Sequence, residues 1–148
     1  MKMTSQESCF YGESHVAAEL VRLGYVVGPT IAGTKDIDIL AVKKDTNKHV
    51  SIQVKTSQNK NLGWEVKNIS EENVKDDLFY VLVLVGETPE YYILPSAKVL
   101  EVSTKEHEDY LSKTKRDGTP RKDVPMKKVT FDYIDRETYL NNWTILER

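Results

Sequence analysis

Cysteine and histidine are scarce in this sequence: its 148 residues contain one cysteine, Cys9, and three scattered histidines. A single cysteine cannot form a disulfide within one molecule, and no two histidines have metal-ligand spacing, which argues against a zinc site. Long apolar runs are also missing. The longest, residues 79–85, is far too short to span a membrane, and residues 1–12 lack the apolar stretch of a secretory signal. We therefore expect a protein without disulfides in the reducing cytoplasm.

The sequence has no large excess of charge of either sign. Its formal net charge of −2 argues against a nucleic-acid partner. The charge is unevenly distributed, however. Residues 112–128 have a local net charge of +5, with seven basic residues (Lys113, Lys115, Arg116, Arg121, Lys122, Lys127 and Lys128) and two acidic ones (Asp117 and Asp123). Such a run is typical of a solvated loop, but it becomes a candidate phosphate contact if the rest of the chain indicates DNA binding.

The length and the hydrophobic fraction of 39% are those of one folded domain, which we place at residues 1–148. Apolar residues at helical spacing predict a helix that starts shortly after Ser8 and runs to residue 23. Strands are predicted at 25–31, 33–43 (a turn, then a strand), 49–56, 64–66, 79–85, 91–95 and 129–131, and further helices at 96–100, 107–113 and 136–141. The order, α-β-β-β-(α)-β-β-α, predicts an α/β fold with a central mixed sheet flanked by helices.

Four polar residues from three separate segments of the sequence are predicted to converge. Asp38 opens the second strand, and a hairpin with the third strand places it near Gln53 and Lys55, which share one face of that strand. Glu13 lies at the start of the first helix, on the edge that faces the sheet. Two carboxylates and a side-chain oxygen suit Mg²⁺, which keeps several waters. Such an ion can polarise a phosphoryl oxygen, and a lysine beside it can position the attacking water.

Each of these residues also has a purely structural interpretation. An aspartate at the start of a strand is often a turn residue, and Asp36 could fill that role equally well. A Gln-x-Lys pair on a half-exposed strand is often its solvent face, and Glu13 is favoured in the first turn of a helix by the helix dipole. The order and spacing of the four residues together favour a functional site.

Three segments resemble the pattern of a known family: G-E-S-H-V-A-A-E-L-V-R-L-G-Y (residues 12–25), G-T-K-D-I-D-I-L-A-V (33–42) and S-I-Q-V-K-T-S (51–57). They resemble the PD-(D/E)XK, or restriction-endonuclease-like, nuclease superfamily, whose pattern is a helix with Glu, a strand with Asp and a strand with (D/E)-x-Lys. The resemblance implies a restriction-endonuclease-like core of α-β-β-β-α-β order.

The resemblance assigns individual residues. Glu13 matches the glutamate of the family better than Glu19 does, Asp38 matches the aspartate, and Lys55 matches the lysine. The acidic residue two positions before the lysine is Gln53 here, a Gln-x-Lys variant that occurs in the methylated-DNA restriction branch of the family. Because glutamine offers a carbonyl oxygen but no negative charge, we expect weaker metal binding.

The resemblance implies a metal-dependent endonuclease that hydrolyses DNA with Mg²⁺ or Mn²⁺ as cofactor. Glu13, Asp38 and Gln53 would bind the metal, and Lys55 would orient the water. The candidate DNA contacts lie just after the motif strand and in the basic loop: Gln58, Asn59, Lys60, Lys113, Lys115, Arg116, Arg121 and Lys122. A homodimer is expected by analogy with family members of this size.

Two other functions stay open. The first is a nuclease fold that binds DNA or regulates without hydrolysis, which Gln53 and the slight acidic excess favour and which a lack of metal binding would support. The second is a protein-interaction domain without a nucleic-acid role. Its surface would be formed by aromatic residues of a kind that more often belongs to a core: Trp64, Trp143, Tyr91 and Tyr92.

Overall fold

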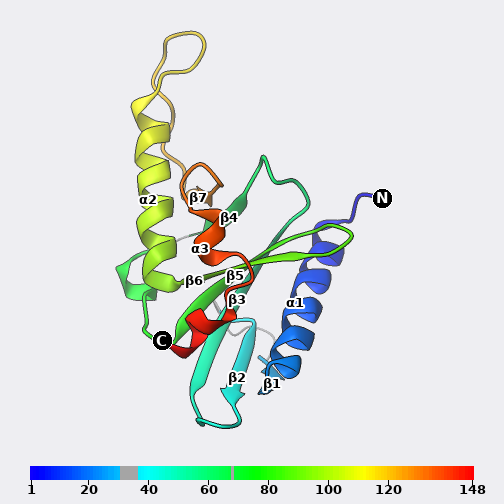
Figure 1. The fold of residues 1–148 in the computed structure, drawn as a ribbon. Helices are drawn as coiled ribbons and strands as arrows, with labels where there is room; N and C mark the ends of the chain where they lie inside the picture. The colour runs from blue at the N-terminus through cyan, green and yellow to red at the C-terminus, as the bar shows by residue number, and fades with distance from the viewer. Residues whose placement is uncertain (31–36, 68) are drawn as a thin grey trace.

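The computed structural model describes residues 1–30, 37–67 and 69–148. Its main elements (Figure 1) are α1 (Ser5–Arg22), β1 (Tyr25–Pro29), β2 (Ile39–Lys43), β3 (His49–Ser57), β5 (Leu78–Leu84), β6 (Glu90–Pro95) and α2 (Ser96–Ser112). Shorter elements are β4 (Trp64–Lys67), β7 (Met126–Val129), η1 (Glu71–Asn73), α3 (Arg136–Tyr139) and η2 (Trp143–Glu147). No helix in the described part of the chain is long and apolar enough to cross a membrane.

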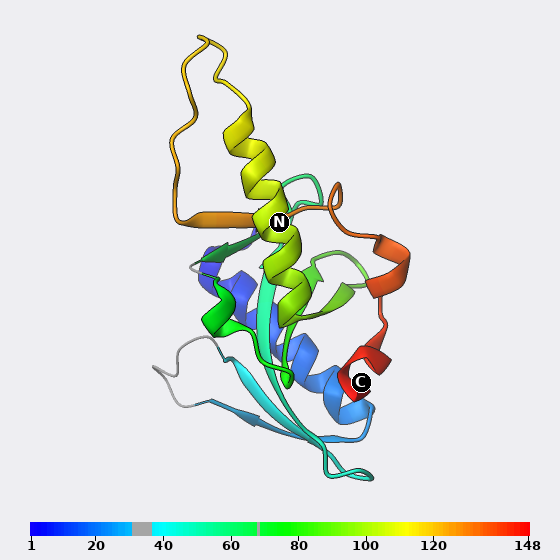
Figure 2. The ribbon, with the colours of Figure 1, turned by 90° about the vertical axis from the view of Figure 1, so that its left-hand side faces the viewer.

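The fold has three layers, with the main sheet between α1 and α2. The sheet contains five strands in the order β1-β2-β3-β5-β6, and a separate two-stranded sheet pairs β4 with β7. In the main sheet β3 and β5 are parallel, and the other pairs are antiparallel. Figure 2 shows α2 in front of the main sheet and α1 behind it. The predicted α/β fold, a central mixed sheet flanked by helices, is confirmed.

The hydrophobic core has two halves, one on each face of the main sheet. Along β5, Phe79, Val81 and Val83 belong to the half beneath α1, whereas Tyr80 and Leu82 belong to the half beneath α2 and the β4–β7 pair. Because successive side chains of a strand point to opposite faces, a strand buried on both sides is apolar throughout. The interpretation of residues 79–85 as a strand covered on both faces is therefore confirmed, with β5 displaced by one residue.

The first helix is longer than its apolar pattern indicates. It begins at Ser5, because Thr4 forms a capping box with Glu7: Thr4 Oγ1 accepts a hydrogen bond from Glu7 N at 3.2 Å, and Thr4 N donates to Glu7 Oε2 at 2.7 Å. The predicted start after Ser8 was therefore wrong.

The second helix is continuous, whereas the sequence pattern predicted two helices at 96–100 and 107–113. The connecting residues are held by tertiary contacts: Ser103 is fully buried, and Glu106 Oε1 accepts hydrogen bonds from Thr130 N at 3.0 Å and Thr130 Oγ1 at 2.8 Å. These contacts join α2 to the residue that follows β7, a contact that local periodicity does not reveal.

Two strand predictions also differ from the structure. β1 continues through Gly28 and Pro29, which were expected to break it, because β1 is an edge strand where a residue without an N–H is tolerated. The predicted strand at 129–131 lies earlier, at Met126–Val129, where it pairs with β4. Residues 33–36, the predicted turn that includes Asp36, lie outside the described residues.

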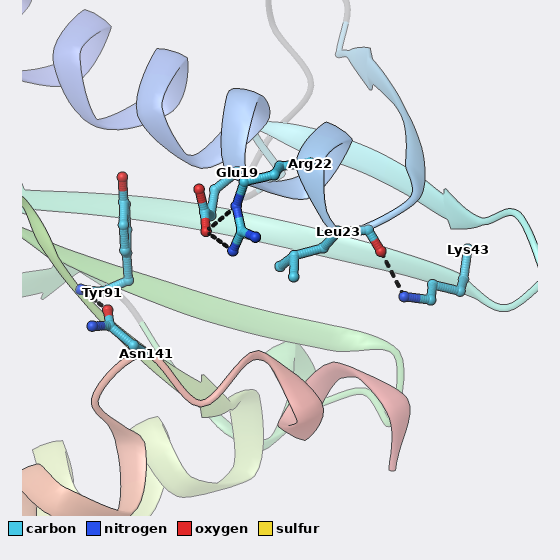
Figure 3. A network of polar contacts seen from close by, with 6 residues as sticks. All are labelled: Glu19, Arg22, Leu23, Lys43, Tyr91 and Asn141. Atoms are coloured by element: carbon cyan, nitrogen blue, oxygen red, sulfur yellow. Dashed lines mark hydrogen bonds and ion pairs between the residues drawn. The ribbon is translucent and has the colours of Figure 1, made fainter.

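Polar contacts fasten the C-terminal end of α1 and the end of the chain to the sheet (Figure 3). Lys43 Nζ, on β2, donates to the Leu23 carbonyl at 2.7 Å. Asn141 N donates to the Tyr91 carbonyl at 2.6 Å, and Tyr91 N donates to Asn141 Oδ1 at 3.2 Å. The first contact fixes the end of α1 on β2, and the other two fix the C-terminal segment on β6.

The N-terminal half of α1 approaches β3 closely at Gly12. A Cβ atom on Gly12 would lie 1.9 Å from Thr56 Oγ1 and 3.3 Å from Val54 Cγ1. Any side chain larger than hydrogen would therefore push the helix and the strand apart. The close packing also places the next residue, Glu13, beside β3.

We expect Gly12→Ala to lower the free energy of unfolding, measured by urea denaturation. Overpacking costs about 1–3 kcal/mol, and the better helix propensity of alanine returns only about 1 kcal/mol. Adding Thr56→Ala, which removes the nearest atom, should recover part of the loss. Gly28→Ala serves as the control, because a Cβ there meets nothing within 4 Å. A Gly12→Ala protein as stable as the wild type would contradict the close packing.

Candidate active site

The candidate site forms where β3 extends beyond β2. The β2–β3 pairing ends at Ile39 and Ile52, whereas β3 continues to pair with β5 through Ser57. Past Ile52, this edge of β3 pairs with no strand among the described residues. Asp38 covers the start of the open edge: its N donates to the Ile52 carbonyl at 2.9 Å, and its Oδ2 accepts from Val54 N at 2.8 Å. The carboxylate thus satisfies a backbone donor that would otherwise need a strand.

A cleft of about 960 Å³ opens along this edge. All four residues predicted to be catalytic line it: Glu13 from α1, Asp38 before β2, and Gln53 and Lys55 from β3. The remaining walls come from residues 1–3, from the loop after β3 and from the β4–β7 pair. The structure therefore brings the four side chains into one cleft.

Glu13 and Asp38 influence each other electrostatically. Partial loss of hydration, and to a lesser degree the negative charge of Asp38, raise the pKa of Glu13. The ionised form of Glu13 is therefore less favourable here than in water, and a nearby cation would offset part of this cost. Glu19 is already engaged, because it accepts a hydrogen bond from Arg22 Nε at 2.9 Å (Figure 3), and it is not among the described residues that line the cleft. Of the two helix glutamates, Glu13 and Glu19, it is therefore Glu13 that lines the cleft.

Gln53 supplies an oxygen without a partner. Its Oε1 is buried and accepts no hydrogen bond from the described residues, although leaving such an atom unpaired costs about 1–3 kcal/mol. No group of three His, Cys, Asp or Glu residues that could hold a metal occurs in the described ranges. An ion in this cleft would rely on the carboxylates of Glu13 and Asp38, the Gln53 oxygen and water. That all-oxygen set fits Mg²⁺ or Mn²⁺.

Lys55 is on the same strand face as Gln53, two residues further along β3. No ion pair in residues 1–30, 37–67 or 69–148 includes Lys55. Its ammonium group is therefore available to an anionic ligand in the cleft.

Comparison with solved structures gives an independent view of this arrangement. A bacterial homing endonuclease, I-Ssp6803I, matches 99% of this chain and 94% of its own length, with a TM-score of 0.56 and 15% sequence identity. The chain shares its fold with an endonuclease. No protein-family model and no curated protein matches the sequence. The predicted nuclease fold is thus confirmed as a fold.

The loop after β3 contains the candidate DNA contacts Gln58, Asn59 and Lys60. All three are exposed, but the Gln58 amide is already engaged with the backbone of Met3. Met3 N donates to Gln58 Oε1 at 2.8 Å, and Gln58 Nε2 donates to the Met3 carbonyl at 2.9 Å. Gln58 therefore anchors residues 1–3 as a wall of the cleft.

The predicted basic loop is a mostly exposed loop between α2 and β7. Residues 113–125, here called the basic arm, extend beyond the end of α2 in both ribbon views (Figures 1 and 2). An isolated antiparallel β-bridge pairs Thr114 with Pro120 across the arm. The Arg121 guanidinium lies 4.6 Å from the centre of the Tyr110 ring. In the arm Lys113, Lys115, Arg116 and Lys122 are exposed, whereas Arg121 is half-buried.

Three charged residues of the cleft were not assigned to the site from the sequence. Lys2 precedes α1, whereas Glu65 on β4 and Lys128 on β7 are cross-strand partners. Lys128 belongs to the basic run, whose predicted extent to residue 128 was too long because β7 begins at Met126. The β4–β7 pairing joins distant parts of the sequence, so no local signal could have placed Lys128 in the cleft.

The aromatic residues considered for a partner surface belong to the core. Trp64 and Tyr92 are buried in the half of the core beneath α2, and Tyr91 is buried in the half beneath α1, against which Trp143 packs. The protein-interaction hypothesis therefore has no surface at these positions.

The pKa of Glu13 gives a stability test. Folding raises this pKa above its ordinary value of 4.5, so the folded protein binds the proton more tightly than the unfolded chain and loses stability as the pH rises above that value. We expect Glu13→Gln, measured without added metal, to raise Tm at neutral pH and to flatten the loss of Tm between acidic and neutral pH. Glu19→Gln, the matched control, should give no gain. A lower Tm for Glu13→Gln at neutral pH would show that the ionised Glu13 carboxylate stabilises the fold, and would contradict the prediction.

Proposed function

We propose that the protein is a PD-(D/E)XK-type nuclease that hydrolyses phosphodiester bonds in DNA with a divalent metal ion. The observation that carries the proposal is the content of one cleft. Beside the carboxylates of Glu13 and Asp38 it holds the buried, unpaired oxygen of Gln53 and the ammonium group of Lys55, which is in no ion pair of the described residues. The fold shared with a homing endonuclease supports the same chemistry.

Each side chain has a distinct role in this proposal. When bound, Mg²⁺ or Mn²⁺ would polarise a phosphoryl oxygen and acidify a coordinated water. Glu13 and Asp38 supply the negative charge that retains the ion, and Gln53 adds a neutral oxygen. The Val54 N–H holds Asp38 Oδ2 at 2.8 Å, which leaves the other carboxylate oxygen for the metal. Lys55 orients the attacking water and stabilises the negative charge that develops on the phosphate.

The basic arm supports DNA as the substrate. Lysine and arginine side chains displace counterions from phosphates, and this term supplies most of the affinity for a duplex irrespective of sequence. In this proposal the arm contacts phosphates outside the cleft through Lys113, Lys115, Arg116, Arg121 and Lys122. Lys60, in the loop after β3, contacts a phosphate beside the cleft. The homodimer expected from the sequence stays a prediction.

A DNA-binding module without hydrolysis is the second candidate function, and Gln53 favours it. Glutamine stands where the pattern of the family has an acidic residue, so the metal site lacks one negative charge. Such a protein would bind DNA through the same basic arm without cutting it.

We expect the wild-type protein to nick supercoiled plasmid in Mn²⁺ or Mg²⁺ but not in EDTA. Asp38→Asn keeps an oxygen for Val54 N while removing the charge, and Lys55→Ala removes the ammonium group. Each should lower the nicking rate by about 100-fold or more. Glu19→Gln and Lys44→Gln, which change charges outside the cleft, should nick like the wild type. Nicking in EDTA, or equal rates in all variants, would contradict the proposal. Metal-independent DNA binding without nicking would establish the second candidate instead.

Restoring the missing charge gives a separate test. Gln53→Glu should lower the Mg²⁺ concentration needed for half-maximal nicking by about tenfold, because the number of charged ligands sets the affinity for the ion. Asn59→Asp adds the same charge in the cleft lining while keeping the oxygen that accepts from Asn61 N at 2.9 Å, and it should leave the Mg²⁺ requirement unchanged. If both variants act alike, Gln53 does not occupy a ligand position.

A further inference from the structure

The cleft contains two lysines that the proposed reaction does not use. Lys2, before α1, and Lys128, on β7, line the same cleft as Lys55. Within the described ranges no ion pair includes either lysine, although Glu65 lies directly across from Lys128 in the β4–β7 register. The cations that do form ion pairs lie outside the cleft: Arg22, Lys43, Lys98, Lys105, His107 and Arg136. Although Glu13, Asp38 and Glu65 line the same cleft, none of its three lysines forms an ion pair within the described chain.

The residues that follow Lys2 are fixed to the body of the protein by hydrogen bonds. The two hydrogen bonds between Met3 and Gln58, at 2.8 and 2.9 Å, join the N-terminal segment to the loop after β3. The capping box of Thr4 and Glu7 then fixes the entry into α1. The backbone next to Lys2 is therefore tethered to the body of the protein at Met3.

Lys128 is held by a different part of the fold. It lies within β7, where the flanking Val129 pairs with Trp64 of β4 and is completely buried. The loop that leads into β4 packs tightly here, because a Cβ atom on Gly63 would lie 2.3 Å from the Val129 carbonyl oxygen. Lys2 and Lys128 are thus presented by two separate, fixed walls of the cleft.

We propose that Lys2 and Lys128 bind the phosphates on either side of the scissile phosphate, so that one DNA strand runs along the cleft past Lys55. The inference rests on the proposed function and adds binding residues to it. Three ammonium groups without ion pairs, from β3, β7 and the segment before α1, line a cleft of about 960 Å³, which is far larger than a single phosphate. A ligand with regularly repeated negative charges fits such an arrangement. Gln58 is then a positioning residue that acts through the backbone next to Lys2.

The salt dependence of DNA binding tests this inference. Binding of a short fluorescent duplex is measured by anisotropy at several salt concentrations, with Ca²⁺ in place of Mg²⁺. Each phosphate contact contributes about −0.9 to the slope of log K against log salt concentration. Lys2→Gln and Lys128→Gln should each reduce the slope by about that amount, and the double variant by about twice as much. Lys44→Gln, an exposed lysine in the β2–β3 turn outside the cleft, should keep the wild-type slope.

A double-mutant cycle separates the positioning role of Gln58 from a general structural role. Gln58→Ala should reduce the slope as Lys2→Gln does, and combining the two should add little further, because both remove the same phosphate contact. Gln58→Ala combined with Lys128→Gln should be additive. Equal coupling of Gln58→Ala to both lysine variants would indicate a structural role and overturn the assignment of Gln58.

The inference and the proposed function fail in distinguishable ways. If the wild type nicks plasmid in Mn²⁺ but both lysine variants keep its salt slope, the phosphate path is wrong and the nuclease stands. The same conclusion follows if Lys44→Gln loses as much slope as the cleft variants, since the effect is then one of net charge. If the wild type neither binds nor nicks DNA, the proposed function fails and the inference fails with it.

Discussion

The backbone of β3 must be satisfied along both of its edges, and β2 is too short to do this over the whole strand. Where β2 stops, Val54 N is left without a strand partner and is satisfied by the Asp38 carboxylate at 2.8 Å. Leaving this N–H unpaired would cost about 1–3 kcal/mol. One hydrogen bond therefore completes the sheet and also fixes a charged group at the mouth of the cleft, so that the stability of the fold and the geometry of the site depend on the same side chain.

The remaining parts of the site follow from packing around this edge. Gly12 lets α1 lie against β3, and the next residue, Glu13, loses part of its hydration there. This loss, and to a lesser degree the charge of Asp38, raises the pKa of Glu13. The charged form of Glu13 is therefore less favourable than in water, and a bound cation would stabilise it. The buried oxygen of Gln53 adds a second unfavourable feature that a ligand would remove. The fold thus holds a carboxylate and an unpaired oxygen in positions that cost folding free energy without a ligand and that a bound cation would stabilise.

Sequence reasoning succeeded where the physics is local or has a simple period. Alternation along β3 placed Gln53 and Lys55 on one face, and the hairpin with β2 brought Asp38 to the same end of the strand. It was less successful where tertiary contacts override local preference. The start of α1 depends on the capping box at Thr4, and the unbroken middle of α2 depends on the hydrogen bonds of Glu106 to Thr130. These contacts compensate for segments whose apolar pattern is weak.

The order of strands and helices, and the four residues Glu13, Asp38, Gln53 and Lys55, were determined by the sequence itself, because hydrophobic period and motif spacing are properties of neighbouring residues. The walls of the cleft were decided only by the tertiary structure. Lys128 reaches the cleft through the pairing of β7 with β4, and residues 1–3 through the hydrogen bonds of Met3 to Gln58. Such contacts join segments distant in the chain, and their partners are chosen by the packing of the whole core rather than by any local pattern.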